Sequence, residues 1–204
     1  MATTTTNYGF DIPQSTDLVK DGATAIATLG QDIDTAMNTA LGTKKAGLVL
    51  LNTTSFSGVA SQSINDVFSA TYNSYKIIPN ITTTDGISIG MRMRVSGSDL
   101  TTGYKGSGFY LSYTASDFAK EANVTTYFQV IYVGGSPNFG QAEITLHNPF
   151  ATARTNFVSP YSRSDNLLGM WGGNTDATTS YTGFTLFPIT GTMTGQVQVY
   201  GFNK

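Results

Sequence analysis

Apolar and polar residues alternate along much of the chain after residue 46. In residues 87–95, isoleucine, methionine and valine occupy every second position, and serine, glycine and arginine occupy the positions between them. This pattern is typical of an antiparallel strand with one buried face. Residues 46–204 are therefore predicted to form a mainly β head domain, an antiparallel jelly-roll-like β-sandwich whose strands are separated by turn-forming segments. Besides 87–95, we expect strands at 47–56, 64–70, 75–81, 108–114, 125–134, 142–148, 154–160, 166–171, 181–189 and 194–202.

A helical pattern occupies residues 15–45. Ser, Thr and Asp at 15–17 are suited to a helix N-cap, and Gly42 is suited to the C-terminal end. Between them, apolar residues recur at alternating steps of three and four, which is the narrow a/d seam of a coiled coil. We expect a short helical trimerisation segment, because an isolated helix of this length is marginal in water and both a positions hold isoleucine. The seam consists of Ile26, Leu29, Ile33, Ala36, Met37 and Ala40.

Two alternatives remain open for this helix. It can pack against its own β domain, or it can dock on a different protein. Residues 1–14, which precede it, show no helical period, and their apolar residues Tyr8, Phe10 and Ile12 are spaced two apart. We expect an extended arm there.

Composition narrows the function classes. Only 12% of the 204 residues are charged, about half the usual share, and the formal net charge is −2. We therefore expect neither a disordered charged tail nor a nucleic-acid-binding protein. With no Cys and the single His147, we expect no metal site and no cofactor. We also expect no membrane insertion and no secretion signal, because no apolar run approaches ~18 residues and the first residues lack a basic and apolar leader.

Catalytic motifs are scarce. The sequence has no nucleophile elbow, phosphate-binding loop or zinc-protease motif, and His147 is more simply a hydrogen-bonded structural residue. Two carboxylate pairs, Asp117 with Glu121 and Asp165 with Asp176, are candidates for glycoside hydrolysis, and the second also for calcium binding. The first pair is more simply a solvated helical turn. We expect a binding or structural protein and not an enzyme.

The loops around the single Trp combine aromatic rings with short polar side chains. Such a combination can recognise a sugar or a peptide edge. The alternative is that Trp171 is a core residue covered by glycines. The candidate receptor-binding residues are Tyr161, Arg163, Asp165, Trp171, Asn174, Asp176 and Tyr181.

Several segments resemble structural proteins of tailed bacteriophages. Residues 8–13 (YGFDIP) together with 18–34 (LVKDGATAIATLGQDID) resemble the N-terminal segment of tail fibres and minor tail proteins. Residues 68–78 (FSATYNSYKII), 91–97 (MRMRVSG) and 191–201 (GTMTGQVQVYG) are similar to the β domains of those proteins. The resemblance implies a homotrimer with an N-terminal anchor and a C-terminal head that faces the host. It brings no catalytic motif with it.

On this resemblance, Tyr8, Phe10 and Ile12 are expected to anchor the arm to other virion proteins of the tail or capsid. The expected function is a short trimeric tail fibre, located in the virion after assembly in the host bacterial cytoplasm, whose head can bind a host surface glycan or protein. Alternatives are a capsid decoration or head-fibre protein without a specific receptor, and, less favoured, a glycan depolymerase.

Overall fold

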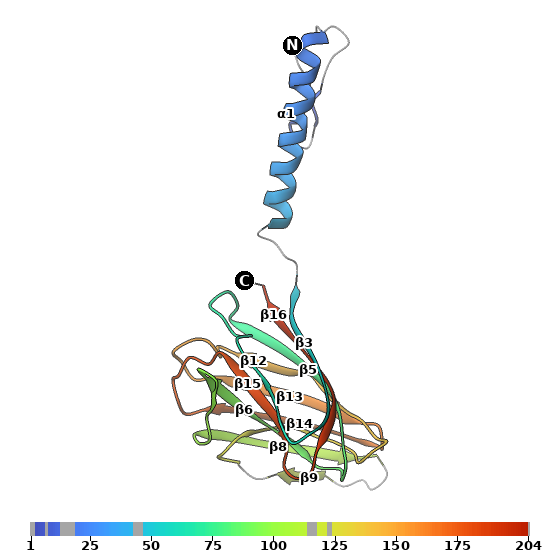
Figure 1. Ribbon diagram of the computed structural model, residues 1–204, viewed down its shortest axis with the longest axis vertical. Coiled ribbons are helices and arrows are strands. Elements are labelled where there is room, and N and C mark those ends of the chain that lie inside the picture. Colours follow the sequence, from blue (N-terminus) through green and yellow to red (C-terminus); the bar gives the residue numbers. More distant parts are fainter. Residues whose placement is uncertain are drawn as a thin grey trace. The chain divides into compact units, whose positions relative to one another are not determined.

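The computed structural model describes residues 3–6, 8–12, 19–42, 47–113, 118–121 and 124–203. The chain divides into two compact units, residues 1–47 and 48–204, which Figure 1 shows in blue and in cyan to red. The expected N-cap at 15–17 lies outside the described residues, as does Asp117. Of Glu121, only the backbone is described.

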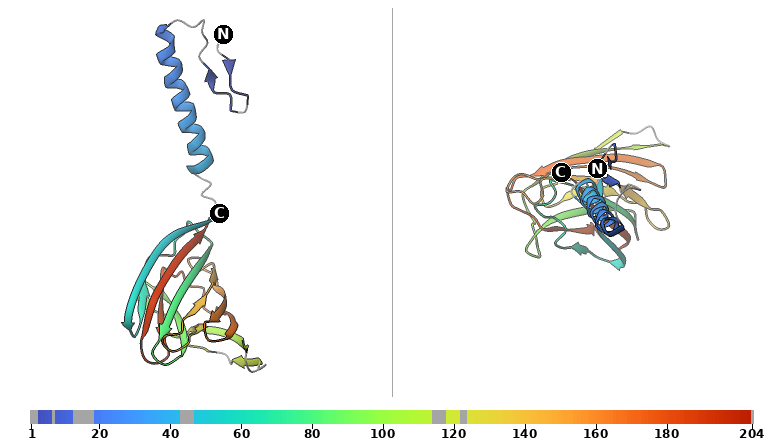
Figure 2. Two further views of the ribbon diagram at one scale, coloured as in Figure 1. Left: turned by 90° about the vertical axis from the view of Figure 1, so that its right-hand side faces the viewer. Right: turned by 90° about the horizontal axis from the view of Figure 1, so that it is seen from above.

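The first unit is a helix with a small hairpin beside it (Figure 2). The helix α1 (Val19–Met37) continues into a π-helical turn, η1 (Asn38–Gly42). Strand β1 (Thr3–Thr4) pairs antiparallel with β2 (Asp11–Ile12). The Thr5 amide donates to the Phe10 carbonyl at 2.9 Å, and the Phe10 amide donates to the Thr5 Oγ1 at 2.9 Å. The arm therefore differs from the extended segment expected, because it turns back on itself through these bonds.

The second unit is an antiparallel β-sandwich of two sheets, which confirms the predicted fold class. The larger sheet has the strand order β3-β16-β5-β11-β13-β14-β8-β9, and β12 pairs with both β5 and β13. Its strands are β3 (Leu48–Val59), β5 (Ser74–Thr83), β8 (Tyr104–Ser112), β9 (Phe118–Glu121), β11 (Gly140–Ala142), β12 (Ile144–His147), β13 (Asn156–Arg163), β14 (Leu167–Thr175) and β16 (Met193–Phe202).

The smaller sheet has the order β10-β6-β15-β4, with β7 paired to β6. It consists of β4 (Gln62–Ile64), β6 (Ser88–Val95), β7 (Ser98–Asp99), β10 (Phe128–Tyr132) and β15 (Gly183–Pro188). The expected strand 64–70 is wrong beyond residue 64. Asp66 has a positive φ of 54°, which ends the strand, and the Val67 amide then donates to the Thr182 carbonyl.

The core lies between the two sheets and follows the expected alternation. In β6, Ile89, Met91 and Met93 are all fully buried. Within the described part of the chain, no helix is long and apolar enough to cross a membrane.

Large rings in the core face glycines on the neighbouring strand. Trp171 of β14 lies opposite Gly108 of β8, and a Cβ on that glycine would come within 2.5 Å of the indole. Tyr161 of β13 lies opposite Gly169 of β14, where a Cβ would meet the phenol ring at 2.5 Å. These glycines are required by space and not by backbone conformation.

Gly172 and Gly173 provide a matched test of this packing. A Cβ on Gly173 would overlap the Lys105 carbonyl oxygen of β8, whereas a Cβ on Gly172 meets nothing closer than the Phe157 carbonyl oxygen at 3.6 Å. We predict that Gly173→Ala lowers the free energy of unfolding by about 2 kcal/mol, because the paired backbone has to shift. Gly172→Ala should change it by less than about 1 kcal/mol. Chemical denaturation measures both, and equal losses would contradict the packing described here.

Candidate binding groove

The aromatic residues predicted for receptor recognition are core residues, so that part of the prediction is wrong. Trp171 is 1% exposed, Tyr161 is 5% exposed and Tyr181 is fully buried. Trp171 and Tyr161 occupy inward positions of paired strands, and the glycines opposite them make room for the rings. Burial also raises the pKa of Tyr181. The alternative interpretation of Trp171, a core tryptophan covered by glycines, is the one that the structure supports.

Three of the four polar candidates, Arg163, Asp165 and Asp176, have internal partners, and the Asn174 Oδ1 is buried without one among the described residues. Arg163 and Asp165 form a two-point ion pair, with Nε to Oδ1 at 2.6 Å and Nη2 to Oδ2 at 2.8 Å. The Arg163 guanidinium also lies 4.7 Å from the centre of the Tyr132 ring. The hydrogen bond from Arg163 lowers the pKa of Asp165. The ionised pair therefore stabilises the fold above the usual pKa of an aspartate, and this stabilisation is lost as the pH falls through the lowered value.

Asp165 and Asp176 do not form a carboxylate pair. In the β13–β14 register, Arg163 lies opposite Leu167 at one end of β14, and Asn174 lies near the other end. Seven residues of strand separate these ends by about 24 Å. Asp176 instead pairs with the Lys105 Nζ at 2.9 Å. The glycosidase and calcium readings of this pair are therefore wrong, and the seven candidates form no common surface.

His147 has a structural contact, since its Nδ1 lies 2.9 Å from the Ser74 Oγ across the β5–β12 pair. Among the described residues, no group of three metal-binding side chains comes together.

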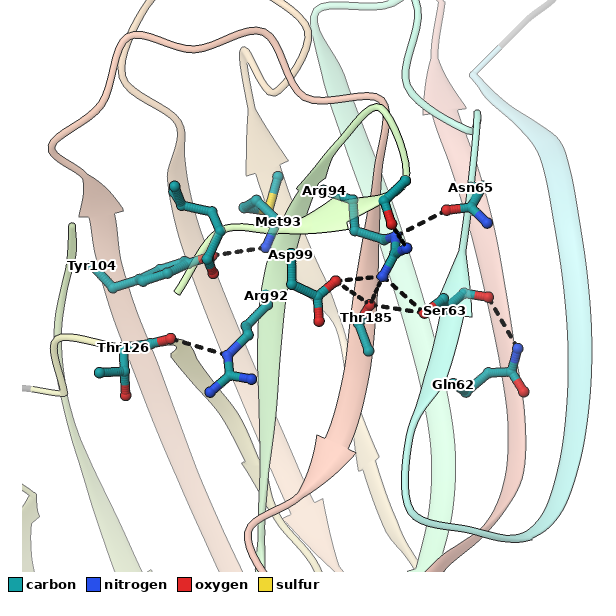
Figure 3. Close-up of polar contacts among 12 residues, drawn as sticks. Gln62, Ser63, Asn65, Arg92, Met93, Arg94, Asp99, Tyr104, Thr126 and Thr185 are labelled. Atoms are coloured by element: carbon teal, nitrogen blue, oxygen red, sulfur yellow. Dashed lines mark hydrogen bonds and ion pairs between the residues drawn. The ribbon is translucent and has the colours of Figure 1, made fainter. Parts of the chain in front are cut away.

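A polar cluster on the smaller sheet joins four strands (Figure 3). The Arg94 guanidinium of β6 forms an ion pair with Asp99 of β7 and donates to the Thr185 Oγ1 of β15 at 2.7 Å. It also donates to the Ser63 Oγ of β4 at 3.0 Å and to the Asn65 Oδ1 at 2.9 Å. Since its donors are used within the chain, Arg94 holds the sheet together and is not available to a ligand.

A groove of about 490 Å³ lies on the outer face of the larger sheet. It crosses β16, β5, β11 and β13, and its volume is in the range of small-molecule sites. Gln196 of β16 lies opposite Asn80 of β5, which lies opposite Gln141 of β11. Gln141 in turn lies opposite Ser162 of β13. These four side chains, the amide row, stand side by side across the sheet, and each is half-buried or exposed.

A second set of residues, the floor row, lies one step along the same strands. Gln198 lies opposite Ile78, and the shared register of β11 and β12 with β5 places Ile78 opposite Glu143. The Glu143 amide donates to the Pro160 carbonyl at 3.0 Å. Pro160 has no N–H to return this bond, so it cannot satisfy the Glu143 carbonyl. The floor row therefore contains two apolar side chains, Ile78 and Pro160, beside the polar side chains of Gln198 and Glu143.

The groove carries no net charge. Glu143 is the one side chain charged at neutral pH among the described residues that line it, and the Lys76 Nζ lies 2.7 Å from its Oε2. The Gln196 Nε2 donates to the Ser55 Oγ at 3.1 Å, which leaves its carbonyl oxygen as an acceptor. The Tyr200 hydroxyl donates to the Gln198 Oε1 at 3.2 Å, which leaves the Gln198 Nε2 as a donor. These two hydrogen bonds orient the Gln196 and Gln198 side chains before any ligand binds.

This groove was not predicted from the sequence. Its one sequence signal is that Asn80, Gln141, Gln196 and Gln198 occupy outward positions of strands. Which of these positions adjoin each other depends on strand order, and alternation does not reveal that order.

Comparisons with known proteins identify no family for the chain. No family model and no curated protein matches it. Among solved structures, the galectin LEC-6 of Caenorhabditis elegans is similar at a TM-score of 0.31 and 6% identity, over 74% of this chain and 96% of the galectin.

We predict that Trp171→Ala destabilises the head, because it leaves a cavity between the sheets. The loss in free energy of unfolding should be about 3–5 kcal/mol. Met170→Ala, at the adjacent outward-facing and 39% exposed position, is the control and should cost less than about 1 kcal/mol. Chemical denaturation of both variants checks this, and a Trp171→Ala protein as stable as the control would contradict the burial of the indole.

Proposed function

We propose that the chain is a structural protein of a bacteriophage virion, a short homotrimeric appendage attached by its N-terminal unit and presenting a β head. The observation that carries the proposal is the exposed apolar seam of α1. Ile26 is 65% exposed, Ile33 is 40% exposed and Met37 is 55% exposed. Large apolar side chains repeated along one helix gain free energy when they are buried, at about 25 cal/mol per Å². Further copies of the same helix can bury them in a coiled coil.

The hairpin lies close to this seam. Tyr8 and Phe10 stack on each other, with ring centres 5.6 Å apart, and they line an apolar cavity of about 310 Å³ together with the C-terminal half of the helix. The helix contributes Ile33, Ala36, Met37 and Ala40 to this cavity. Two of the three predicted anchor residues and four of the six predicted seam residues thus line one apolar cavity, and Tyr8, 74% exposed, adds further apolar area for a partner.

The proposed number of three chains rests more on the phage resemblance than on the seam residues. Isoleucine at a with leucine at d, as in Ile26, Leu29 and Ile33, is also the pattern of two-stranded coils. The trimer is therefore a separate claim with its own measurement.

Two other functions use the same parts. A capsid decoration or head-fibre protein needs the trimer and the anchor but no ligand site on the head. A glycan depolymerase needs an acid pair, and the pair at Asp165 and Asp176 is separated along β14.

Ile33→Asp tests the assembly. We predict that the wild-type chain sediments at three times its 21.7 kDa mass and that Ile33→Asp sediments as a monomer, because the variant places a charge in the seam. Gln31→Asp adds the same charge on the opposite side of the helix and should remain a trimer. A wild-type monomer or dimer, or an Ile33→Asp trimer, would contradict the proposal.

Deletion of residues 1–14 tests the attachment. We predict that mass spectrometry of purified phage particles detects the full chain and not the shortened one, because the deletion removes Tyr8, Phe10 and Ile12. The shortened chain should still form trimers in solution. Equal amounts of both chains in the particles would refute the anchor.

A further inference from the structure

We propose that the groove on the larger sheet binds a neutral oligosaccharide that lies across strands β16, β5, β11 and β13. The inference rests on the proposed function in one respect: a head that faces the host would meet oligosaccharides on the host surface. Of the seven receptor-binding residues predicted from the sequence, Tyr161 alone lines this groove, and its side chain is buried in the core.

The amide row matches the hydroxyl groups of a sugar. Gln196, Asn80, Gln141 and Ser162 stand on four adjacent strands, and three inter-strand spacings of ~4.8 Å give the row a length of about 14 Å. Amide and hydroxyl side chains both donate and accept hydrogen bonds, as sugar hydroxyls do. A row of them spaced along a line fits a ligand with repeated hydroxyls.

The floor row matches the less polar face of a sugar ring. Ile78 and Pro160 provide apolar contact beside the amide row, and the Gln198 Nε2 adds a hydrogen-bond donor. A polar row beside a row that contains two apolar side chains suits an amphipathic ring and not a wholly apolar ligand. The Gln196 and Gln198 amides are already oriented by Ser55 and Tyr200, which reduces the entropy lost on binding.

Charge selects against acidic glycans. Lys76 is already paired with Glu143, whose side chain is 62% exposed at the edge of the groove. A carboxylate or phosphate on the ligand would meet this like charge and no unpaired cation among the groove residues that the structure describes. The ligand class is therefore neutral.

The test is binding of the full chain to a printed array of neutral and acidic bacterial glycans. We expect binding to one or more neutral glycans. Affinity should fall about three- to tenfold in Asn80→Ala and in Gln198→Ala, since each loses a hydrogen bond to the ligand. Asn156→Ala removes an exposed amide from β13 outside the groove and should bind as the wild type does. Circular dichroism and the melting temperature confirm that each variant is folded.

Absence of glycan binding, binding to acidic glycans alone, or full binding by the double variant Asn80→Ala/Gln198→Ala would overturn the inference. The sedimented mass of the same samples separates this result from the proposed function. A trimer without glycan binding refutes only the groove, and a monomer that binds neutral glycans through Asn80 and Gln198 refutes only the trimeric appendage.

Discussion

The sandwich depends on the match between inward-facing rings and the glycines opposite them. Trp171 fills the space left by Gly108, and Tyr161 fills the space left by Gly169. Gly173 has even less space for a side chain, because the Lys105 carbonyl oxygen occupies the place that a Cβ would take. Close packing of this kind leaves little tolerance for added volume. It also fixes the register of β8, β13 and β14, since a shift by one residue would turn every ring to the outer face.

This packing decides where recognition can occur. Each strand gives one face to the core, so a ligand can reach only the outward positions, the strand ends and the loops. The outward residues of four adjacent strands form two rows, one of amides and one with Ile78 and Pro160 as apolar contacts. The groove is as poor in charge as the whole chain, because it is built from neutral donors and acceptors with a single ion pair. On the smaller sheet, by contrast, Arg94 is fully engaged in joining strands.

The fold class could be predicted from the sequence, whereas the site could not. Alternation is a local property, so residues 87–95 were sufficient to predict β6, and the seam was sufficient to predict α1. The turn of the arm depends on bonds between Thr5 and Phe10, which apolar spacing does not reveal. The residue types around Trp171 predicted an aromatic patch, but Gly108, which makes room for its indole, comes from a strand more than sixty residues earlier in the chain. Asn80 and Gln196 adjoin only because β5 pairs with β16, a long-range contact.

Fluorescence of the single tryptophan tests the central claim, that the rings of β13 and β14 are core and recognition belongs to the outer face. Because Trp171 is the only tryptophan of the 204 residues, its emission reports one site. The account predicts emission shifted to the blue of free tryptophan in water, and resistance to quenching by acrylamide and iodide in the folded protein. Both properties should be lost together on denaturation. Emission like that of free tryptophan, with full quenching in the folded state, would place the indole on the surface and contradict the account.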